Sequence, residues 1–380
     1  MRGAVFVVGV AEAPLGRVQD QSELSMVALA AKEALAEAGL TQHDVDGLFV
    51  NYMGEEGSVQ VGEYLGIQPT YADSSDLGGA AFLAHVQHAV AAIESRRCTV
   101  ALIAYASRQR SRKNRTASFI PDSYSLTGQF EAPYGLPMPI GHYALIAARH
   151  MHEFGTTSEQ FAEVAVAARR WAQLNPKAWT HDDLTIDDVL ASPLISDPLH
   201  KLDCCLRTDG GGAVVLAGEP VACGAAKRPV RILGTGESHT HWNISQMPDL
   251  TVTAGARSAS AAFEMAGLTA AEMDVVEPYD SFTSSAVIQL EDLGFCKRGE
   301  GGTFVEGGRL APGGELPAMT SGGGLSYCHP GALGILLLVE LTRQLRGEAG
   351  ERQVAAARVG VAHAVGGLMS TAATVILAGE

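Results

Sequence analysis

The chain has 380 residues, of which 47% are hydrophobic, so it can bury a large core in two or three domains or in one duplicated unit. Its formal net charge of -15 argues against nucleic acid or an anionic membrane as the main partner, because both attract an excess of Lys and Arg. No apolar run reaches membrane-spanning length, and the N-terminal apolar run is too short for a secretory signal.

The six cysteines are scattered without the spacing of a metal site, and only Cys204 and Cys205 are adjacent. Two pairs of alternating histidines, at positions 150/152 and 239/241, also lack partners at ligand spacing. We therefore expect reduced thiols in a cytoplasmic protein, with no metal and no tightly bound cofactor.

The first predicted elements alternate between strand and helix, and their pattern recurs later in the chain. Residues 4–8 predict a buried strand, 23–38 a helix and 46–51 a second strand. The sequence Ala-Gly-Leu-Thr at 38–41, with an Asp five residues on, returns at 266–269 with its own Asp. A closing strand at 213–219 likewise resembles 374–380. Two similar α/β halves, 1–222 and 223–380, are therefore expected.

Inside the first half, residues 73–81 predict a turn that leads into a helix ending near residue 93. A turn of this kind can place a nucleophile at a helix N-terminus, and the candidate here is Ser75. The pattern is not the Gly-x-Ser-x-Gly of hydrolases, so a helix-capping role for Ser75 is the favoured alternative. The polar and then helical stretch at about 107–203 predicts an inserted loop domain that covers the active site.

A short basic run at 108–113 stands out in this acidic protein, and its Arg110 could meet the phosphates of coenzyme A. A solvated loop or a subunit contact is the alternative that we favour for the run. In the second half, Tyr279 follows a predicted strand at 274–277. Ligands of α/β sheets bind at that edge, although a tyrosine that only packs its ring remains possible. The glycines at 299–314 predict a cover loop.

The stretch 321–331 is the most informative one in the sequence. Its glycines, including Gly323 and Gly324, permit close approach of a ligand such as coenzyme A, and Tyr327 and His329 follow two residues apart. A helix is predicted directly afterwards, at 332–345. The stretch thus indicates a loop that points side chains at a substrate, with a glycine turn and a packed histidine as the open alternative.

Taken together, these blocks resemble the thiolase superfamily, and more narrowly its sterol-carrier-protein or lipid-transfer branch. The resemblance runs through the chain in the family's order. It is carried by Gly78-Gly79, Ala132 to Gly135, Phe154 to Thr157, Asn175-Pro176, Asp197-Pro198, Asp203 to Cys205, Asp209 to Gly211, Tyr279 to Phe282 and Gly322 to Pro330. It implies a duplicated α/β fold in a five-layered αβαβα sandwich, normally dimeric, that acts on coenzyme A thioesters.

The sequence departs from that family at its two reactive cysteines. Ser75 stands at the nucleophile position, and the second cysteine falls at or beside His363. The resemblance keeps His329, whose family role is a hydrogen bond to the thioester oxygen. Cys328 replaces a family glycine and is interpreted as a small filler first and as a nucleophile second.

The remaining set is similar to that of thiolase-like aldolases that shorten steroid side chains. By resemblance, Tyr279 and Tyr327 form an acid and base pair, with either assignment open, and His329 contacts the oxyanion. The expected reaction is retro-aldol cleavage of a β-hydroxyacyl-CoA with a steroid or other bulky side chain, giving a ketone and a short acyl-CoA such as propionyl-CoA.

Two alternatives remain open at this point. One is an acyltransferase or thiolase that uses Ser75 or Cys328. The other is a non-catalytic acyl-CoA-binding subunit of a complex. The resemblance also implies a homodimer and, as a possible partner, a small OB-fold acyl-CoA-binding protein.

Overall fold

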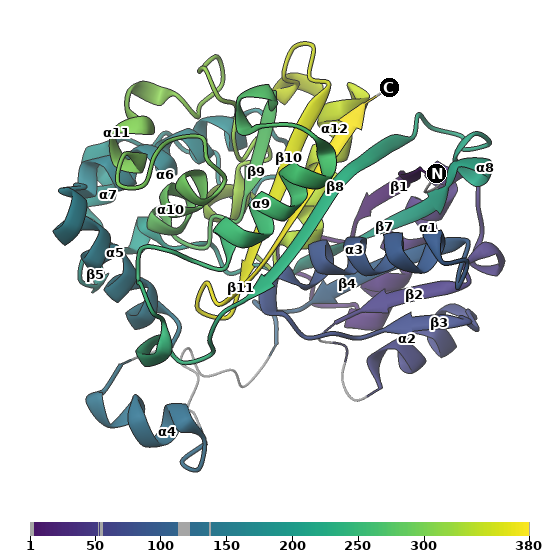
Figure 1. The fold of residues 1–380 in the computed structure, drawn as a ribbon, viewed down its shortest axis with the longest axis horizontal. Helices are drawn as coiled ribbons and strands as arrows, with labels where there is room; N and C mark the ends of the chain where they lie inside the picture. The colour runs from purple at the N-terminus through teal and green to yellow at the C-terminus, as the bar shows by residue number, and fades with distance from the viewer. Residues whose placement is uncertain (1–3, 52, 54–55, 113–121, 137, 380) are drawn as a thin grey trace.

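The computed structural model describes residues 4–51, 53, 56–112, 122–136 and 138–379. Lys113 of the basic run and Glu380 of the second sequence repeat lie outside these residues. One large sheet runs through the molecule, with nine strands in the order β3-β2-β4-β7-β1-β8-β11-β10-β9 (Figure 1). In the described part of the chain, no helix is both long and apolar enough to cross a membrane.

Five strands of the sheet precede residue 219, and four follow residue 229. The strands are β1 (Val5–Glu12), β2 (Gly47–Val50), β3 (Tyr71–Asp73), β4 (Val100–Ser107), β7 (Gly210–Gly218), β8 (Val230–His239), β9 (Val275–Pro278), β10 (Val359–Gly366) and β11 (Thr371–Gly379). Both groups use the same pairing: β1-β7-β4-β2 corresponds to β8-β11-β10-β9, with two antiparallel ladders and then a parallel one. The exact boundary of the halves at 222/223 stays a prediction.

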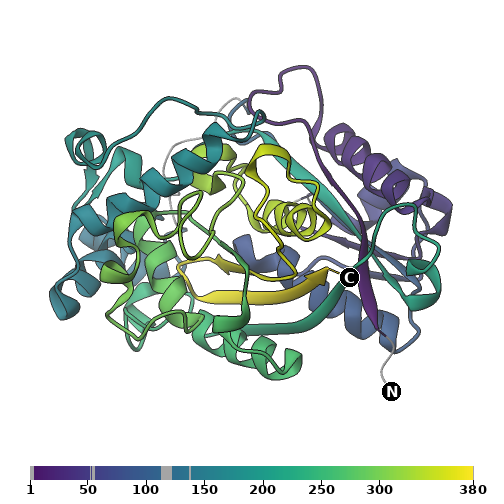
Figure 2. The ribbon, with the colours of Figure 1, turned by 90° about the horizontal axis from the view of Figure 1, so that it is seen from above.

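The two groups of strands meet at a narrow seam. β1 pairs with β7 along most of its length but with β8 only through Phe6 and Val7, which face Arg231 and Val230. The two groups of strands thus act as two sheets that are joined only at β1. α3 (Ala81–Glu94) and α12 (Gly334–Arg346) lie between them and contact strands of both groups. Figure 2 shows α12, in yellow-green, inside the molecule.

Helices on the outside complete the layers. α1 (Glu23–Ala38) packs on β1, β7 and β4, and α9 (Gly255–Ala266) packs on β8, β11 and β10. Every residue of β2, β9 and the middle of β10 and β11 is buried, as expected for strands covered on both faces. The layers thus alternate as helix, sheet, helix, sheet and helix, which confirms the predicted α/β thiolase-type fold.

The sequence repeat folds in the same way in both halves. Gly39 and Gly267 end α1 and α9 with φ angles of 72° and 68°, a left-handed conformation that costs glycine little. Thr41 and Thr269 then begin short 3₁₀ turns with capping boxes. The aspartate that follows each turn accepts backbone N–H groups at the start of the neighbouring strand, at Thr99 and Val100 in one half and at Arg358 and Val359 in the other.

A mostly helical segment is inserted between β4 and β7. Its elements are α4 (Leu126–Phe130), α5 (Ile140–Phe154), α6 (Ser158–Gln173), α7 (Ile186–Ala191), β5 (Leu194–Ser196) and β6 (Leu199–His200). Except for the projecting α4, these elements lie beside α10 (Thr283–Asp292) and α11 (Gly301–Phe304) in Figure 1. The remaining short helices are α2 (Gly57–Leu65) and α8 (Glu219–Ala222). The inserted segment therefore packs against the C-terminal half, next to the glycine loop.

Candidate active site

The glycine loop is held in place by one buried carboxylate. Residues 323–327 form a single π-helical turn, and Asp280 accepts the N–H groups of Gly324 at 2.6 Å and Leu325 at 3.1 Å. A Cβ on Gly323 would lie 2.1 Å from Asp280 Oδ2, and the φ of 59° also favours glycine, so only glycine fits at this position. Burial raises the pKa of Asp280 to about 7. The loop and the end of β9 thus form one rigid unit.

Tyr279, at the end of β9, and His329, at the end of this loop, are in direct contact. The Tyr279 hydroxyl lies 3.0 Å from His329 Nε2 and accepts the backbone N–H of Leu333 at 3.1 Å. The tyrosine ring also covers Gly79, where a Cβ would lie only 2.5 Å from it. The elbow, β9 and the start of α12 therefore meet at this hydroxyl.

Both members of this pair are uncharged near neutral pH. Burial raises the pKa of Tyr279 well above its usual value, and burial lowers the pKa of His329 to about 4. Either group can donate to the other, since a hydroxyl and a neutral imidazole each both donate and accept. Leu333 is the N-cap of α12, and the N-terminus of this helix stabilises negative charge on the tyrosine oxygen. The pair is thus suited to moving a proton at a fixed point.

Tyr327 is buried nearby, but its hydroxyl has ionic partners. It donates to Glu12 Oε1 at 2.5 Å, and Glu12 also pairs with Arg343 at 2.8 Å and with Lys177. Burial alone would raise the pKa of Glu12, but Arg343 and Lys177 lower it to about 2. Burial and the Glu12 charge raise the pKa of Tyr327 well above its usual value. The Tyr327 hydroxyl is therefore bound to this ionic cluster rather than to His329.

Ser75 lies in a different network at the elbow. Its hydroxyl donates to Asp73 Oδ1 at 2.6 Å, and the other oxygen of Asp73 contacts His88 at 2.6 Å. His88 also contacts Glu237 at 2.9 Å. Burial would raise the pKa of Asp73, but the His88 bond lowers it strongly, so this carboxylate is a poor base for activating a serine. The structure does not bring Ser75 to the Tyr279 and His329 pair.

His363 also points away from the pair. It lies on β10, where its Nδ1 contacts the Thr374 hydroxyl at 2.8 Å and its Nε2 lies beside Gly255 of α9. Ala364, the next residue, faces Gly334 at the start of α12. Because strand side chains alternate, His363 and Ala364 are on opposite faces of the sheet. Burial lowers the pKa of His363 to about 3, so it is a neutral core residue.

The thiols near the loop are packed and protonated. Cys328 is buried against Gly210, with its sulfur 3.1 Å from the Thr208 hydroxyl, and burial raises its pKa to about 12. Burial raises the pKa of Cys205 even further, and that of Cys204 to about 12. A thiolate is the reactive form of cysteine, so none of these three thiols is activated as a nucleophile here.

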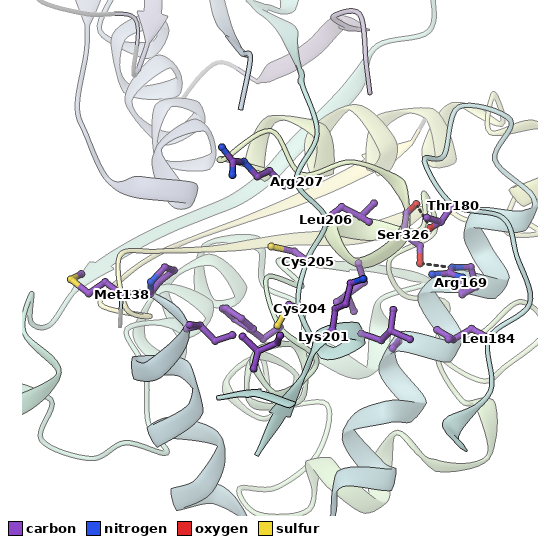
Figure 3. A pocket seen from close by; sticks show the side chains of 17 residues that line it. Met138, Arg169, Thr180, Leu184, Lys201, Cys204, Cys205, Leu206, Arg207 and Ser326 are labelled. Carbon is purple, nitrogen blue, oxygen red and sulfur yellow. Dashed lines mark hydrogen bonds between the residues drawn. The ribbon is translucent and has the colours of Figure 1, made fainter. Parts of the chain in front are cut away.

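A cavity of about 580 Å³ lies beside the glycine loop (Figure 3). Its apolar wall includes Met138, Ile140, Leu184, Phe282 and Leu325, and three cations also line it. These are Arg169, Lys201 and Arg207, and none forms an ion pair with a carboxylate of the described residues. The cavity can therefore take a ligand that is apolar in one part and anionic in another.

Arg110, the predicted contact for coenzyme A, lies next to one of these cations. Its Nη1 donates to the Arg207 carbonyl at 3.1 Å, and its guanidinium lies 4.7 Å from the centre of the Trp179 ring. The other predicted contacts, Gly323 and Gly324, are buried in the loop, and the Gly324 N–H is already bound to Asp280. The contacts of these three residues with coenzyme A stay predictions.

Sequence reasoning missed the residues that support the site. Asp280, Glu12 and Leu333 contribute a loop anchor, a charge and an amide. Asp280 directly follows Tyr279. The glycines of the loop at 321–331 were a usable signal for such a carboxylate, because the backbone N–H groups of a glycine-rich loop can be bound by an anion. Glu12 gave no such signal because its partner Tyr327 is 315 residues away. Leu333 acts through its backbone, which no side-chain pattern reveals.

Known proteins provide an independent comparison. The family model described as thiolase C-terminal domain-like matches residues 236–379. The chain is 32% identical over 378 residues to the acetyl-CoA acetyltransferase of Methanothermobacter thermautotrophicus, covering 97% of this chain and 98% of that protein. The chain belongs to the thiolase superfamily. The family predicted from the sequence motifs is thereby confirmed.

Other members of the thiolase superfamily that resemble this chain carry out a different reaction. One is the 17-hydroxy-3-oxo-4-pregnene-20-carboxyl-CoA lyase of Mycobacterium tuberculosis, 34% identical, covering 91% of this chain and 92% of that protein. A solved structure, the Ltp2-ChsH2(DUF35) aldolase, superposes with a TM-score of 0.91 at 29% identity and covers 99% of this chain and 98% of that chain. Acetyl transfer and carbon–carbon cleavage thus both occur among its relatives.

Proposed function

We propose that this thiolase-superfamily chain is an aldolase that cleaves the Cα–Cβ bond of a β-hydroxyacyl-CoA. The observation that carries the proposal is the pairing of Tyr279 with His329, in a site where none of the three packed thiols, Cys204, Cys205 and Cys328, is activated. A retro-aldol step needs a group that accepts and returns a proton, and it needs no covalent nucleophile. The lyase and the aldolase among the relatives support the same reaction type.

In the proposed reaction, the Tyr279 oxygen takes the proton of the substrate 3-hydroxyl while its own proton passes to His329 Nε2. The oxygen left on C3 forms a carbonyl, and the electrons of the Cα–Cβ bond move to Cα, which gives the enolate of the thioester. The same proton path runs backwards to protonate Cα. A 2-methyl substrate then yields a ketone and propionyl-CoA.

Tyr327 takes a supporting role in this proposal. Its hydroxyl donates to an ionised carboxylate and is ill placed to give a proton to carbon. The predicted contact of His329 with the thioester oxygen is not part of this proton path, because Nε2 is the atom that meets Tyr279, and it stays a prediction from the resemblance. Ser75, His363 and Cys328 take no chemical part.

The test is a reaction with a 2-methyl-3-hydroxyacyl-CoA that carries a tertiary 3-hydroxyl, followed by chromatography with and without free coenzyme A. We expect a ketone and propionyl-CoA in both cases. A second candidate, acyl transfer, is favoured by the similarity to an acetyl-CoA acetyltransferase. Cleavage of a 3-oxoacyl-CoA that depends on free coenzyme A would establish that candidate and reject the aldolase.

We further propose that the chain binds the coenzyme A part of its substrate with Arg110, Arg207 and Lys201, whose charges lack carboxylate partners among the described residues. A steroid or similarly bulky acyl group would occupy the apolar wall of the cavity. A homodimer, a small acyl-CoA-binding partner and a cytoplasmic location complete the proposal. The DUF35 component named with the aldolase neighbour supports the partner, and the free cysteines are typical of the cytoplasm.

A further inference from the structure

The cavity beside the glycine loop has two chemically different ends. Figure 3 shows Met138 at one end and Arg169, Thr180 and Leu184 at the other. Met138 and the lining residues next to it in sequence, Pro139 and Ile140, are apolar. The opposite end carries a buried charge and a hydroxyl. A ligand that fills the whole cavity must therefore satisfy both ends.

The charge at the polar end belongs to Arg169 of α6, whose side chain is only 7% exposed. Its Nε donates to the Ser326 hydroxyl at 2.9 Å, and its Nη1 donates to the Asp182 carbonyl at 2.9 Å. Its Nη2 has no hydrogen-bond partner among the described residues. The charge of Asp182 acts on the guanidinium, but no described carboxylate lies close enough to form an ion pair with it. A buried guanidinium is costly without a counter-charge, because it leaves water and stays ionised.

Ser326 adds a second donor at the same point. Its oxygen accepts from Arg169, and its backbone carbonyl accepts from the Thr180 hydroxyl at 3.0 Å, so the serine proton has no acceptor among the described groups. Arg169 Nη2 and the Ser326 O–H are thus two unused donors beside a positive charge. A carboxylate, which accepts through two oxygens and carries one negative charge, matches this arrangement.

We propose that this end of the cavity binds a carboxylate on the acyl group of the substrate, held by Arg169 and Ser326. The inference rests on the proposed acyl-CoA function and narrows its substrate class to thioesters whose acyl part carries a second, free carboxylate. The acyl group is a better source than a coenzyme A phosphate. Arg110, Arg207 and Lys201 are exposed and available to phosphates, whereas Arg169 is buried next to the glycine loop.

The experiment compares pairs of acyl-CoAs of equal chain length by isothermal titration calorimetry. Glutaryl-, adipyl- and suberyl-CoA carry the second carboxylate, and pentanoyl-, hexanoyl- and octanoyl-CoA lack it. At one or more lengths, we expect the carboxylated thioester to bind about tenfold tighter, as is typical of a hydrogen bond to a charged group. Arg169→Gln should abolish that preference. Arg169→Lys keeps the positive charge but loses the planar pair of N–H donors of the guanidinium, so it should keep part of the preference.

Each outcome has a separate meaning. If no acyl-CoA binds, the proposed function fails. If the two members of every pair bind equally to the wild-type chain, the acyl-CoA function stands and the carboxylate site is rejected. If Arg169→Gln weakens free coenzyme A and both thioesters alike, Arg169 holds a phosphate and the inference is overturned. Thermal unfolding of both variants checks their folding, and the wild-type comparison decides the matter even if one variant does not fold.

Discussion

The two buried tyrosines beside the glycine loop have partners of opposite kinds. The Tyr279 hydroxyl meets a neutral imidazole and a backbone amide, whereas the Tyr327 hydroxyl donates to a carboxylate that also binds two cations. The Tyr279 proton can move to His329 without breaking an existing ion pair, but moving the Tyr327 proton would disrupt an ionic cluster. The comparison teaches that the partner, rather than burial or position on the loop, distinguishes a reactive tyrosine from a structural one.

The largest expected effect on the cleavage rate comes from removing the hydroxyl of Tyr279, and removing the hydroxyl of Tyr327 is the control. Tyr279→Phe should lower kcat for carbon–carbon cleavage by about 10²- to 10⁴-fold, the range typical of a lost general acid or base. Tyr327→Phe removes the same atom from a similar depth and is the matched control, with a change of less than about tenfold. Steady-state kinetics of both variants make the comparison. Equal losses in the two variants would show that both tyrosines take part in the chemistry, as the sequence predicts.

The second test removes the charge from the ionic cluster. Glu12→Gln should lower the free energy of unfolding by about 3 kcal/mol, because the partly buried Arg343 loses the carboxylate with which it pairs. Lys177→Met removes the exposed partner of the same carboxylate and should cost less than about 1 kcal/mol. Urea denaturation measures both. A Glu12→Gln variant as stable as the wild type would contradict the description of this cluster as a structural one.

A third test uses the charged network at the elbow. Hydrogen bonds to Asp73 and Glu237 raise the pKa of His88 to about 9. A histidine whose pKa is higher in the folded than in the unfolded state stabilises the fold when it is protonated. This stabilisation is fully present below the unfolded pKa of about 6.5 and is lost as the pH rises through about 9. Unfolding free energies measured across that window should therefore fall more in the wild type than in His88→Gln. Parallel curves for the two proteins would mean that His88 is not charged in the fold.

The smallest effects are expected at the two alternative nucleophiles. Ser75→Ala and Cys328→Ala should each change the cleavage rate by less than about threefold, since neither side chain is activated. Ser75→Ala should still cost about 1 kcal/mol of stability through its lost hydrogen bond to Asp73. Loss of most activity in either variant, with folding intact, would return acyl transfer to the leading position.

The sequence predicted those parts of the molecule that depend on local patterns. Gly39 and Gly267 end their helices as the repeat suggests, and the strand predicted at 274–277 is β9, which ends at Pro278 directly before Tyr279. The family resemblance placed Tyr279 and His329 in one site but did not predict their contact, because the two are 50 residues apart and no spacing rule joins them.

Other features depend on three-dimensional packing that the motifs do not encode. The orientation of His363 follows from its register on β10, and a shift of one residue would turn it to the opposite face. The pairing of Tyr327 with Glu12 joins the first strand to the glycine loop and leaves no trace in either local sequence. For the same reason, the sequence could suggest two equivalent tyrosines where the structure shows two different environments.

The bond between Glu12 and Tyr327 also has a consequence for synthesis. The two residues are 315 positions apart, and Arg343 comes later still, so β1 leaves the ribosome long before any of these C-terminal partners exists. At about 5 to 20 residues per second, that interval lasts tens of seconds, during which the carboxylate needs water or a chaperone around it. A nascent N-terminal half therefore cannot place Glu12 in its final ionic cluster, which forms only once the last third of the chain has been made.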